Sequence, residues 1–144
     1  MALRAGSRHL PDPIVPAGGI ERANLYFSLT EALVPGSMPA LSEAERATVV
    51  FETSEFVRAQ VEALPPRLLL LMRVGLTGFR LSIRLRHLRS FCALPLSTRR
   101  RVITRWAYGP VPLTRQLFRS LRSTALLAYF EHPTVMLKMS VPPA

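Results

Sequence analysis

The chain has 144 residues, 49% of them apolar, so it is too apolar for general disorder and long enough to bury one modest core. Its formal net charge of +10 comes from 18 arginines and one lysine, Lys138, against nine acids. A single cysteine, Cys92, excludes an internal disulfide and a zinc site built on cysteines.

The acidic residues are concentrated in the first part of the chain. Eight of the nine lie at or before Glu62, and none lies between Ala63 and Phe130, a stretch that carries 13 arginines. An exposed stretch of one sign repels itself. We therefore expect its charge to be met by an acidic or anionic partner, or by the glutamates of the preceding helix.

Residues 1–19 are predicted to form an extended arm. The residues that disfavour a regular helix there are Pro11, Pro13, Pro16, Gly18 and Gly19. The arm has a basic start but neither the apolar stretch of a secretory signal nor a twin-arginine pair. We therefore expect a cytoplasmic protein, with peripheral contact to the inner membrane as an option.

Two helices are predicted after the arm. The first places Leu25, Leu29, Ala32 and Leu33 on one face and ends at Pro35-Gly36. The second begins with a capping box, because Ser42 is followed three residues later by Glu45. Its apolar stripe contains Ala47, Val50, Phe51, Ser54, Val57, Val61 and Leu64, and Pro65-Pro66 ends it.

A third helix is predicted to begin near Pro66 and to cover "RLLLLMRVGLTGFRLSIRLRHLRSF". At about 100° per residue, four of its residues form a narrow cationic stripe. These are Arg73, Arg80, Arg84 and His87. A second stripe, of small residues where another helix could approach closely, contains Gly75, Gly78 and Ser82. Because nearly all its other residues are large and apolar, we expect the helix to be buried on most sides.

Two more helices complete the predicted fold. Ser97 or Thr98 can cap the fourth, "TRRRVITRWAY", and the fifth, "LTRQLFRSLRSTALLAYFEH", stops before Pro133. No alternating strand pattern is present. The sequence therefore predicts one all-α domain, a bundle of about five helices over residues 20–136, followed by an apolar tail at residues 137–144.

The sequence offers little catalytic chemistry. His9, His87 and His132 fit no metal-ligand pattern, and Gly75 and Gly78 lie within a helix pattern rather than a phosphate-binding loop. Cys92 and His87 could be imagined as a nucleophile and its base, but a buried structural cysteine is the favoured interpretation. We expect no catalytic, metal-binding or cofactor-binding residue, and therefore no enzyme activity in this chain alone.

The arginines are better explained by binding to a partner. We assign the stripe of Arg73, Arg80, Arg84 and His87 to carboxylates on another polypeptide. To the same partner-binding set we add Arg99, Arg100 and Trp106 from "STRRRVITRW", although a solvated face also explains most of that run. No DNA- or RNA-binding motif surrounds the run, so nucleic acid is not the expected partner.

A membrane is the alternative partner. The longest uncharged run of the third helix, Val74 to Phe79, has six residues, whereas a span needs about 20. Lying flat on an anionic membrane remains open, since apolar and arginine faces are what an interfacial helix needs. The apolar surface expected for this helix is, however, too wide for immersion from one side.

The order of four segments carries a resemblance. They are "LYFSLTEALVPG", "ALPPRLLLLMRVGL", "FCALPLSTRRRVITRWAYGP" and "RQLFRSLRSTALLAYFEHPTV". Over about residues 22–136 the chain resembles gluconate 2-dehydrogenase subunit 3, the small accessory subunit of membrane-linked flavin dehydrogenases. It is also similar to the N-terminal helical region of long-chain fatty alcohol oxidases of the glucose-methanol-choline (GMC) oxidoreductase family. Two departures are the missing twin-arginine signal and the ending "MLKMSVPPA".

The resemblance implies a noncatalytic accessory subunit. Such a subunit would bind and stabilise a large FAD-bearing GMC-type alcohol dehydrogenase or oxidase, and could help it to reach lipid or an electron acceptor. FAD would belong to that partner, so the resemblance assigns no cofactor to this chain. The competing interpretation is a basic helical protein that binds a membrane surface on its own.

Overall fold

The computed structural model describes residues 17–36, 38 and 40–141, with side chains described from Asn24 onward. These residues form six α-helices, one short 3-10 helix and no strand, which confirms the all-α prediction with one helix more than the five expected. The elements are α1 (Ala17–Leu33), α2 (Glu43–Glu62), α3 (Pro66–His87), η1 (Phe91–Ala93), α4 (Leu96–Ala107), α5 (Pro112–Phe130) and α6 (Pro133–Ser140).

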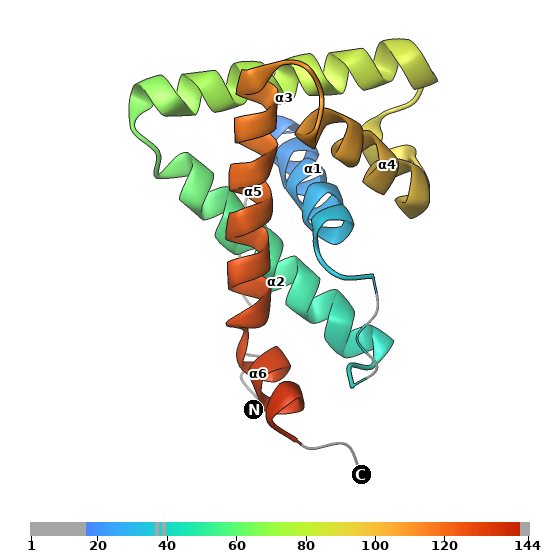
Figure 1. The fold of residues 1–144 in the computed structure, drawn as a ribbon, viewed down its shortest axis with the longest axis vertical. Helices are drawn as coiled ribbons and strands as arrows, with labels where there is room; N and C mark the ends of the chain where they lie inside the picture. Colours follow the sequence, from blue (N-terminus) through green and yellow to red (C-terminus); the bar gives the residue numbers. More distant parts are fainter. Residues whose placement is uncertain (1–16, 37, 39, 142–144) are drawn as a thin grey trace, which may run out of the picture.

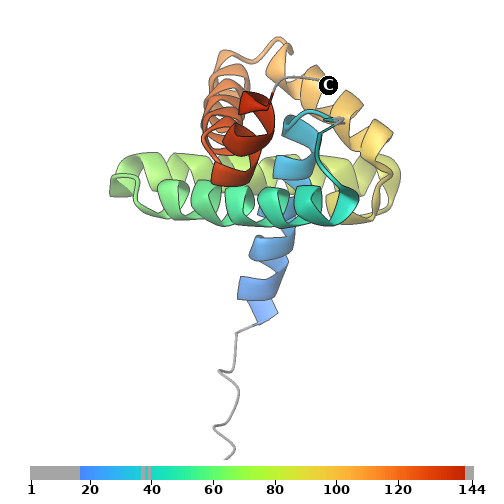
Figure 2. The same ribbon diagram turned by 90° about the horizontal axis from the view of Figure 1, so that it is seen from below.

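The helix α1 is the central element of the bundle and contacts α2, α4 and α5. The helix α3 lies across one end of the molecule, and α6 lies at the opposite end (Figure 1). Figure 2 shows that the first turns of α1 extend beyond the other helices. This arrangement covers α1 on several sides, whereas α3 meets the bundle with one side only.

The main core is built around an aromatic cluster centred on Phe79 of α3. Its ring centroid lies 5.1 Å from that of Phe91, 5.2 Å from Trp106 and 5.0 Å from Phe118. Burial of a side chain of this size is worth about 1.5–3 kcal/mol, so this cluster fixes α3, α4, α5 and η1 to one another. From α1 the core receives the predicted face, with Leu25, Leu29 and Ala32 buried and Leu33 packed against them.

The helix α1 begins earlier than predicted. Gly18 and Gly19, assigned to the extended arm, lie in its first turn. Glycine costs about 0.5–1 kcal/mol inside a helix, and burial of the later residues of α1 outweighs that local cost. The rest of the predicted arm, residues 1–16, lies outside the described residues.

The helix α2 starts as predicted but is rotated relative to its predicted stripe. The Ser42 hydroxyl accepts a hydrogen bond from the Glu45 N–H at 3.2 Å, and the Ser42 N–H donates to the Glu45 carboxylate at 2.9 Å. Val49 and Thr53 are buried, whereas Phe51, predicted to be in the stripe, is 56% exposed. The rotation has a packing cause, because α2 contacts α5 and α6 as well as α1.

The C-terminal tail predicted at residues 137–144 is helical as far as Ser140, which corrects the prediction. The ring of His132 accepts a hydrogen bond from the Thr134 N–H at 3.2 Å and so caps α6. Val135 is fully buried in a second, smaller cluster with Val34, Val49, Val50 and Tyr129. Capping and one buried valine thus stabilise a helix that composition alone did not reveal.

Two predicted helix boundaries also need correction. Neither Ser97 nor Thr98 caps α4, because the helix begins at Leu96 directly after Pro95. The third helix ends at His87 rather than continuing to Phe91, since Leu88 adopts a left-handed backbone with φ of 55°. Proline at the start and a left-handed residue at the end are both recognised helix boundaries.

Candidate docking surface

The prediction that α3 is buried on most sides is wrong. Only Leu76, Phe79 and Ile83 of its 22 residues are buried. They are three and four residues apart, so they form one narrow face that meets the core. The helix crosses the end of the bundle, and no other described helix covers its opposite side (Figure 1).

The side of α3 that points away from the core is apolar and open. We call it the α3 outer face. Its large side chains are Leu71 at 40% exposure, Val74 at 61%, Leu81 at 56% and Leu85 at 73%. Together with the exposed Gly78, they are spaced alternately by three and four residues, as in the contact seam of a coiled coil. The α3 outer face thus has the spacing of a helix contact seam, and no other helix of the described part of the chain lies on it.

The three small residues of α3 do not act together. A Cβ atom at Gly75 would lie 2.6 Å from Cδ1 of Leu117, so α3 and α5 approach closely at Gly75. A Cβ atom at Gly78 would meet nothing within 4 Å. The Ser82 hydroxyl donates to the Phe79 carbonyl at 2.9 Å. Within the described structure, only Gly75 therefore packs against another helix at close range.

The cationic stripe lies between the buried and the open side of α3. Arg73 and Arg84 are exposed, and among the described residues no carboxylate pairs with either of them. Arg80 and Arg84 line a pocket of about 380 Å³ that also contains Asn24, Leu81 and Phe91. The structure thus brings Arg80 and Arg84 together at the edge of the α3 outer face.

His87 of α3 and Trp106 of α4 line a second pocket. This pocket has a volume of about 200 Å³ and is also lined by Ser82. Trp106 is half-buried in the aromatic cluster, where its ring centroid lies 6.0 Å from that of Phe118. Trp106 therefore contributes to the core. The predicted cationic stripe is not one continuous site, because His87 lines a different pocket from Arg80 and Arg84.

Arg99 is a structural residue, which corrects its assignment to partner binding. It is 9% exposed, and its guanidinium donates to the Leu94 carbonyl at 3.1 Å and to the Ser28 carbonyl at 3.1 Å. A third contact joins it to the Glu31 carboxylate at 3.0 Å. These three contacts tie α4 to α1, so Arg99 has a structural role within its own chain.

Arg100 is half-buried against the turn that follows α1. A Cβ atom at Gly36 would lie 2.5 Å from its Nη1 atom, so a larger residue at Gly36 would displace the guanidinium. Its Nη2 atom is buried and has no hydrogen-bond partner among the described residues. Arg100 thus covers this turn and lies apart from the arginines of α3.

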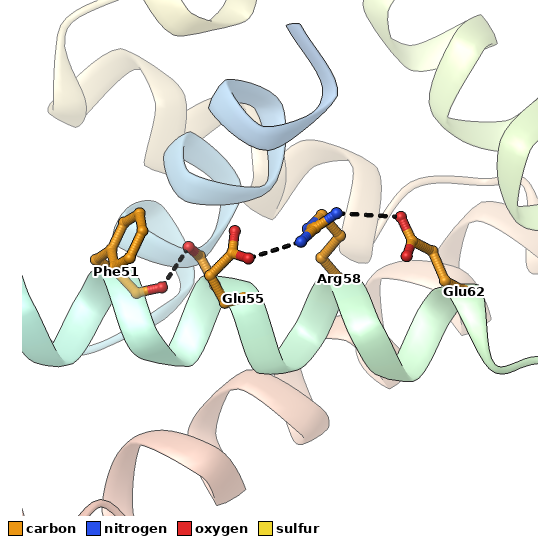
Figure 3. A network of polar contacts seen from close by, with 5 residues as sticks. Phe51, Glu55, Arg58 and Glu62 are labelled. Carbon is orange, nitrogen blue, oxygen red and sulfur yellow. Dashed lines mark hydrogen bonds and ion pairs between the residues drawn. The ribbon is translucent and has the colours of Figure 1, made fainter. Parts of the chain in front are cut away.

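The arginine of α2 contrasts with those of α3. Arg58 lies between two carboxylates of its own helix, with Glu55 at 2.7 Å and Glu62 at 3.5 Å (Figure 3). The hydrogen bond to Glu55, followed by its charge, raises the pKa of the Arg58 guanidinium. Arg58 is thus paired with carboxylates of its own helix, which is not possible for the arginines of α3 because that helix has no acid.

The described residues also bear on three other possibilities: a metal site, a pair of Cys92 with His87, and a membrane-spanning helix. No group of three or more His, Cys, Asp or Glu side chains there could hold a metal ion. Cys92 is exposed, which corrects the interpretation of a buried cysteine, and no hydrogen bond joins it to His87. None of the described helices is both long and apolar enough to cross a membrane.

Comparison with known proteins adds no assignment: no protein-family model, curated protein or solved structure matches the chain. The docking surface is therefore inferred from the exposure and spacing of the side chains of α3. Sequence reasoning missed this surface, although the signal was present in the alternating spacing of Leu71, Val74, Gly78, Leu81 and Leu85.

Proposed function

We propose that this chain is a noncatalytic accessory subunit that binds a partner polypeptide through the α3 outer face. One observation carries the proposal. Four large apolar side chains, 40–73% exposed, share one side of a helix whose other side is fixed in the core. Apolar residues gathered in this way mark interaction surfaces, whereas exposed apolar residues scattered singly are ordinary.

The partner to test first is a large FAD-bearing GMC-type alcohol dehydrogenase or oxidase. The resemblance of residues 22–136 to accessory subunits of such enzymes is what suggests it. In this proposal the flavin and the catalytic groups belong to the partner. This chain supplies the apolar seam on α3 and the arginines beside it.

The test is co-purification from cells that express the tagged chain with the flavoprotein. Replacing Leu81 and Leu85 together with glutamine should abolish recovery of the flavoprotein and of its flavin absorbance. The matched control is Leu127→Gln on α5, since Leu127 is 58% exposed and Leu81 56%. Equal recovery with the double variant and the control would refute docking through this face.

A stand-alone peripheral membrane protein is the second candidate. The apolar outer face is one-sided and has the exposed Arg73 and Arg84 beside it, which is the pattern of a helix lying in a membrane interface. The structure therefore removes the objection that the apolar surface is too wide. Against this candidate, α6 exposes Met136, Leu137 and Met139 at the opposite end of the molecule, so a flat bilayer could not cover both surfaces (Figure 1).

Vesicle flotation separates the two candidates. Salt-sensitive flotation of the isolated chain with anionic vesicles, lost in the Leu81→Gln, Leu85→Gln double variant, would favour the membrane. Recovery of the flavoprotein without flotation favours the accessory subunit. Under this second candidate, we propose that the protein is cytoplasmic and peripheral on the inner membrane.

A further inference from the structure

Building on the docking role proposed above, we infer that the partner segment is a single amphipathic helix with a carboxylate-rich flank, which crosses α3 at Gly78. The inference specifies what the α3 outer face recognises. It rests on the spacing of the face, on an opening at its middle and on the charge beside it.

The spacing selects a helix as the occupant. From Leu71 to Leu85 the face keeps the alternation of three and four residues over about 21 Å of helix, at 1.5 Å per residue. A second helix can follow such a seam along its whole length, because its own side chains recur with the same period. An extended strand, with a period of two, would match the seam at isolated points only.

An opening at Gly78 places the closest approach. Its missing side chain leaves open space, since a Cβ atom there would meet nothing within 4 Å. A residue without a side chain lets two helix backbones come close, and large residues on either side, here Val74 and Leu81, then pack around the crossing.

The charge selects a carboxylate-rich flank. Arg73 and Arg84 are exposed on the same flank of the outer face, about 20° apart around the helix. Among the described residues, no carboxylate pairs with either of them. Glutamate or aspartate on the partner would form charge-assisted hydrogen bonds with these guanidinium groups.

The same charge disfavours a second copy of this chain. A homodimer through α3 would bring two identical arginine-bearing helices together, and each chain carries a formal charge of +10. Like charges set against one another across an interface oppose association. A lipid surface would satisfy the arginines, but it would make no use of the opening at Gly78.

The experiment uses the full chain and three synthetic peptides of 21 residues that share one leucine seam with a central alanine. Their flanks carry glutamate, glutamine or lysine. We expect the glutamate peptide to bind at least tenfold more tightly than the lysine peptide, with the difference shrinking in high salt. Fluorescence anisotropy of labelled peptides measures the affinity.

Two variants locate the bound peptide. Gly78→Leu should weaken binding of the glutamate peptide at least tenfold, while thermal unfolding shows the chain still folded, because the new side chain projects into open space. Arg84→Glu should weaken the glutamate peptide and improve the lysine peptide. Leu127→Gln should leave both affinities unchanged.

The outcomes separate this inference from the proposed function. Equal affinity for all three peptides, or unchanged binding by Gly78→Leu, overturns the acidic helix, as does a stable dimer of the free chain in light scattering. Binding to anionic vesicles that Gly78→Leu leaves unchanged, without peptide binding, also overturns it. The docking role is tested separately. If replacing Leu81 and Leu85 abolishes co-purification of the flavoprotein, the docking role holds even when the peptide experiments overturn the acidic helix.

Discussion

The helices α2 and α3 are similar in length but differ in burial, in N-terminal capping and in the pairing of their charged side chains. In α2, six of 20 residues are buried, the start carries a capping box and Arg58 is paired with its own glutamates. In α3, three of 22 residues are buried, no side chain caps the start and the helix has no acid. Helix α2 pairs Arg58 and buries one face within the described structure, whereas α3 presents exposed leucines and the exposed Arg73 and Arg84, which no other described residue covers or pairs with.

This difference explains how one helix can be both a core element and a docking surface. Phe79 fixes α3 to the bundle through aromatic contacts on one side. The leucines on the other side contribute little to folding because they remain in water. The two sides of α3 should therefore respond differently to mutation, and the predictions below exploit that difference.

The largest expected effect is at the buried side of α3. Phe79→Ala should lower the free energy of unfolding by about 3–5 kcal/mol, because Phe79 is 0% exposed and packs on three aromatic rings. Leu85→Ala, at 73% exposure, should change it by less than about 0.5 kcal/mol. Urea denaturation measures both, and equal losses would show that the two sides of α3 are not distinct.

The next effect concerns Arg99, whose guanidinium binds groups of its own chain. Arg99→Ala should cost about 2–3 kcal/mol, because it removes two hydrogen bonds to carbonyls and leaves Glu31 without its partner. Glu31 is 25% exposed, which keeps the loss below that of a fully buried pair. The exposed neighbour Arg101 provides the control: Arg101→Ala should leave the urea midpoint almost unchanged. Comparable losses would mean that Arg99 is not a structural residue.

A smaller effect distinguishes the two glycines of α3. Gly78→Ala should stabilise the chain by about 0.5–1 kcal/mol, because alanine favours a helix and its Cβ enters open space. Gly75→Ala should bring no such gain, since its Cβ would lie 2.6 Å from Leu117 and force that side chain to move. Thermal unfolding of both variants measures the difference. A stabilising Gly75→Ala would argue against close packing of α3 on α5.

The smallest effect is the pH dependence of the α2 cap. The hydrogen bond from the Ser42 N–H lowers the pKa of Glu45 below the ordinary 4.5. A carboxylate with a lowered pKa stabilises the folded state above its unfolded pKa, and this contribution is lost as pH falls through the folded value. The difference in urea midpoint between the wild type and Glu45→Gln should therefore shrink between pH 6 and pH 3. A difference that does not change with pH would show that the charge of Glu45 is irrelevant to the cap.

Parts of the fold could be predicted because the signals are local. The capping box at Ser42 and Glu45, the apolar face of Leu25 and Leu29, and the proline start of α3 depend on residues close in sequence. The helix α6 could not be predicted, because it depends on Val135 packing against residues of α1, α2 and α5. Local patterns decide where most helices form, whereas tertiary packing decides the marginal ones.

The candidate site was only partly predictable for a related reason. The arc of Arg73, Arg80 and Arg84 follows from helix geometry alone, but which side of α3 meets the core does not. Periodicity also does not distinguish Arg99, which is buried against a helix 71 residues away in the sequence, from its exposed neighbour Arg101. An arginine-rich run can therefore contain both a structural and a solvated residue.

The most direct test of the docking surface is site-specific photo-crosslinking in cells that contain the partner. A benzophenone amino acid is placed in turn at Val74, Leu81 and Leu85 of the α3 outer face, and at Leu127 of α5 as the control of similar exposure. The predicted result is that the three outer-face positions crosslink to neighbouring turns of one helical segment of the same polypeptide, and Leu127 does not. Crosslinks of equal yield from Leu127, or crosslinks from α3 to lipid alone, would contradict the account.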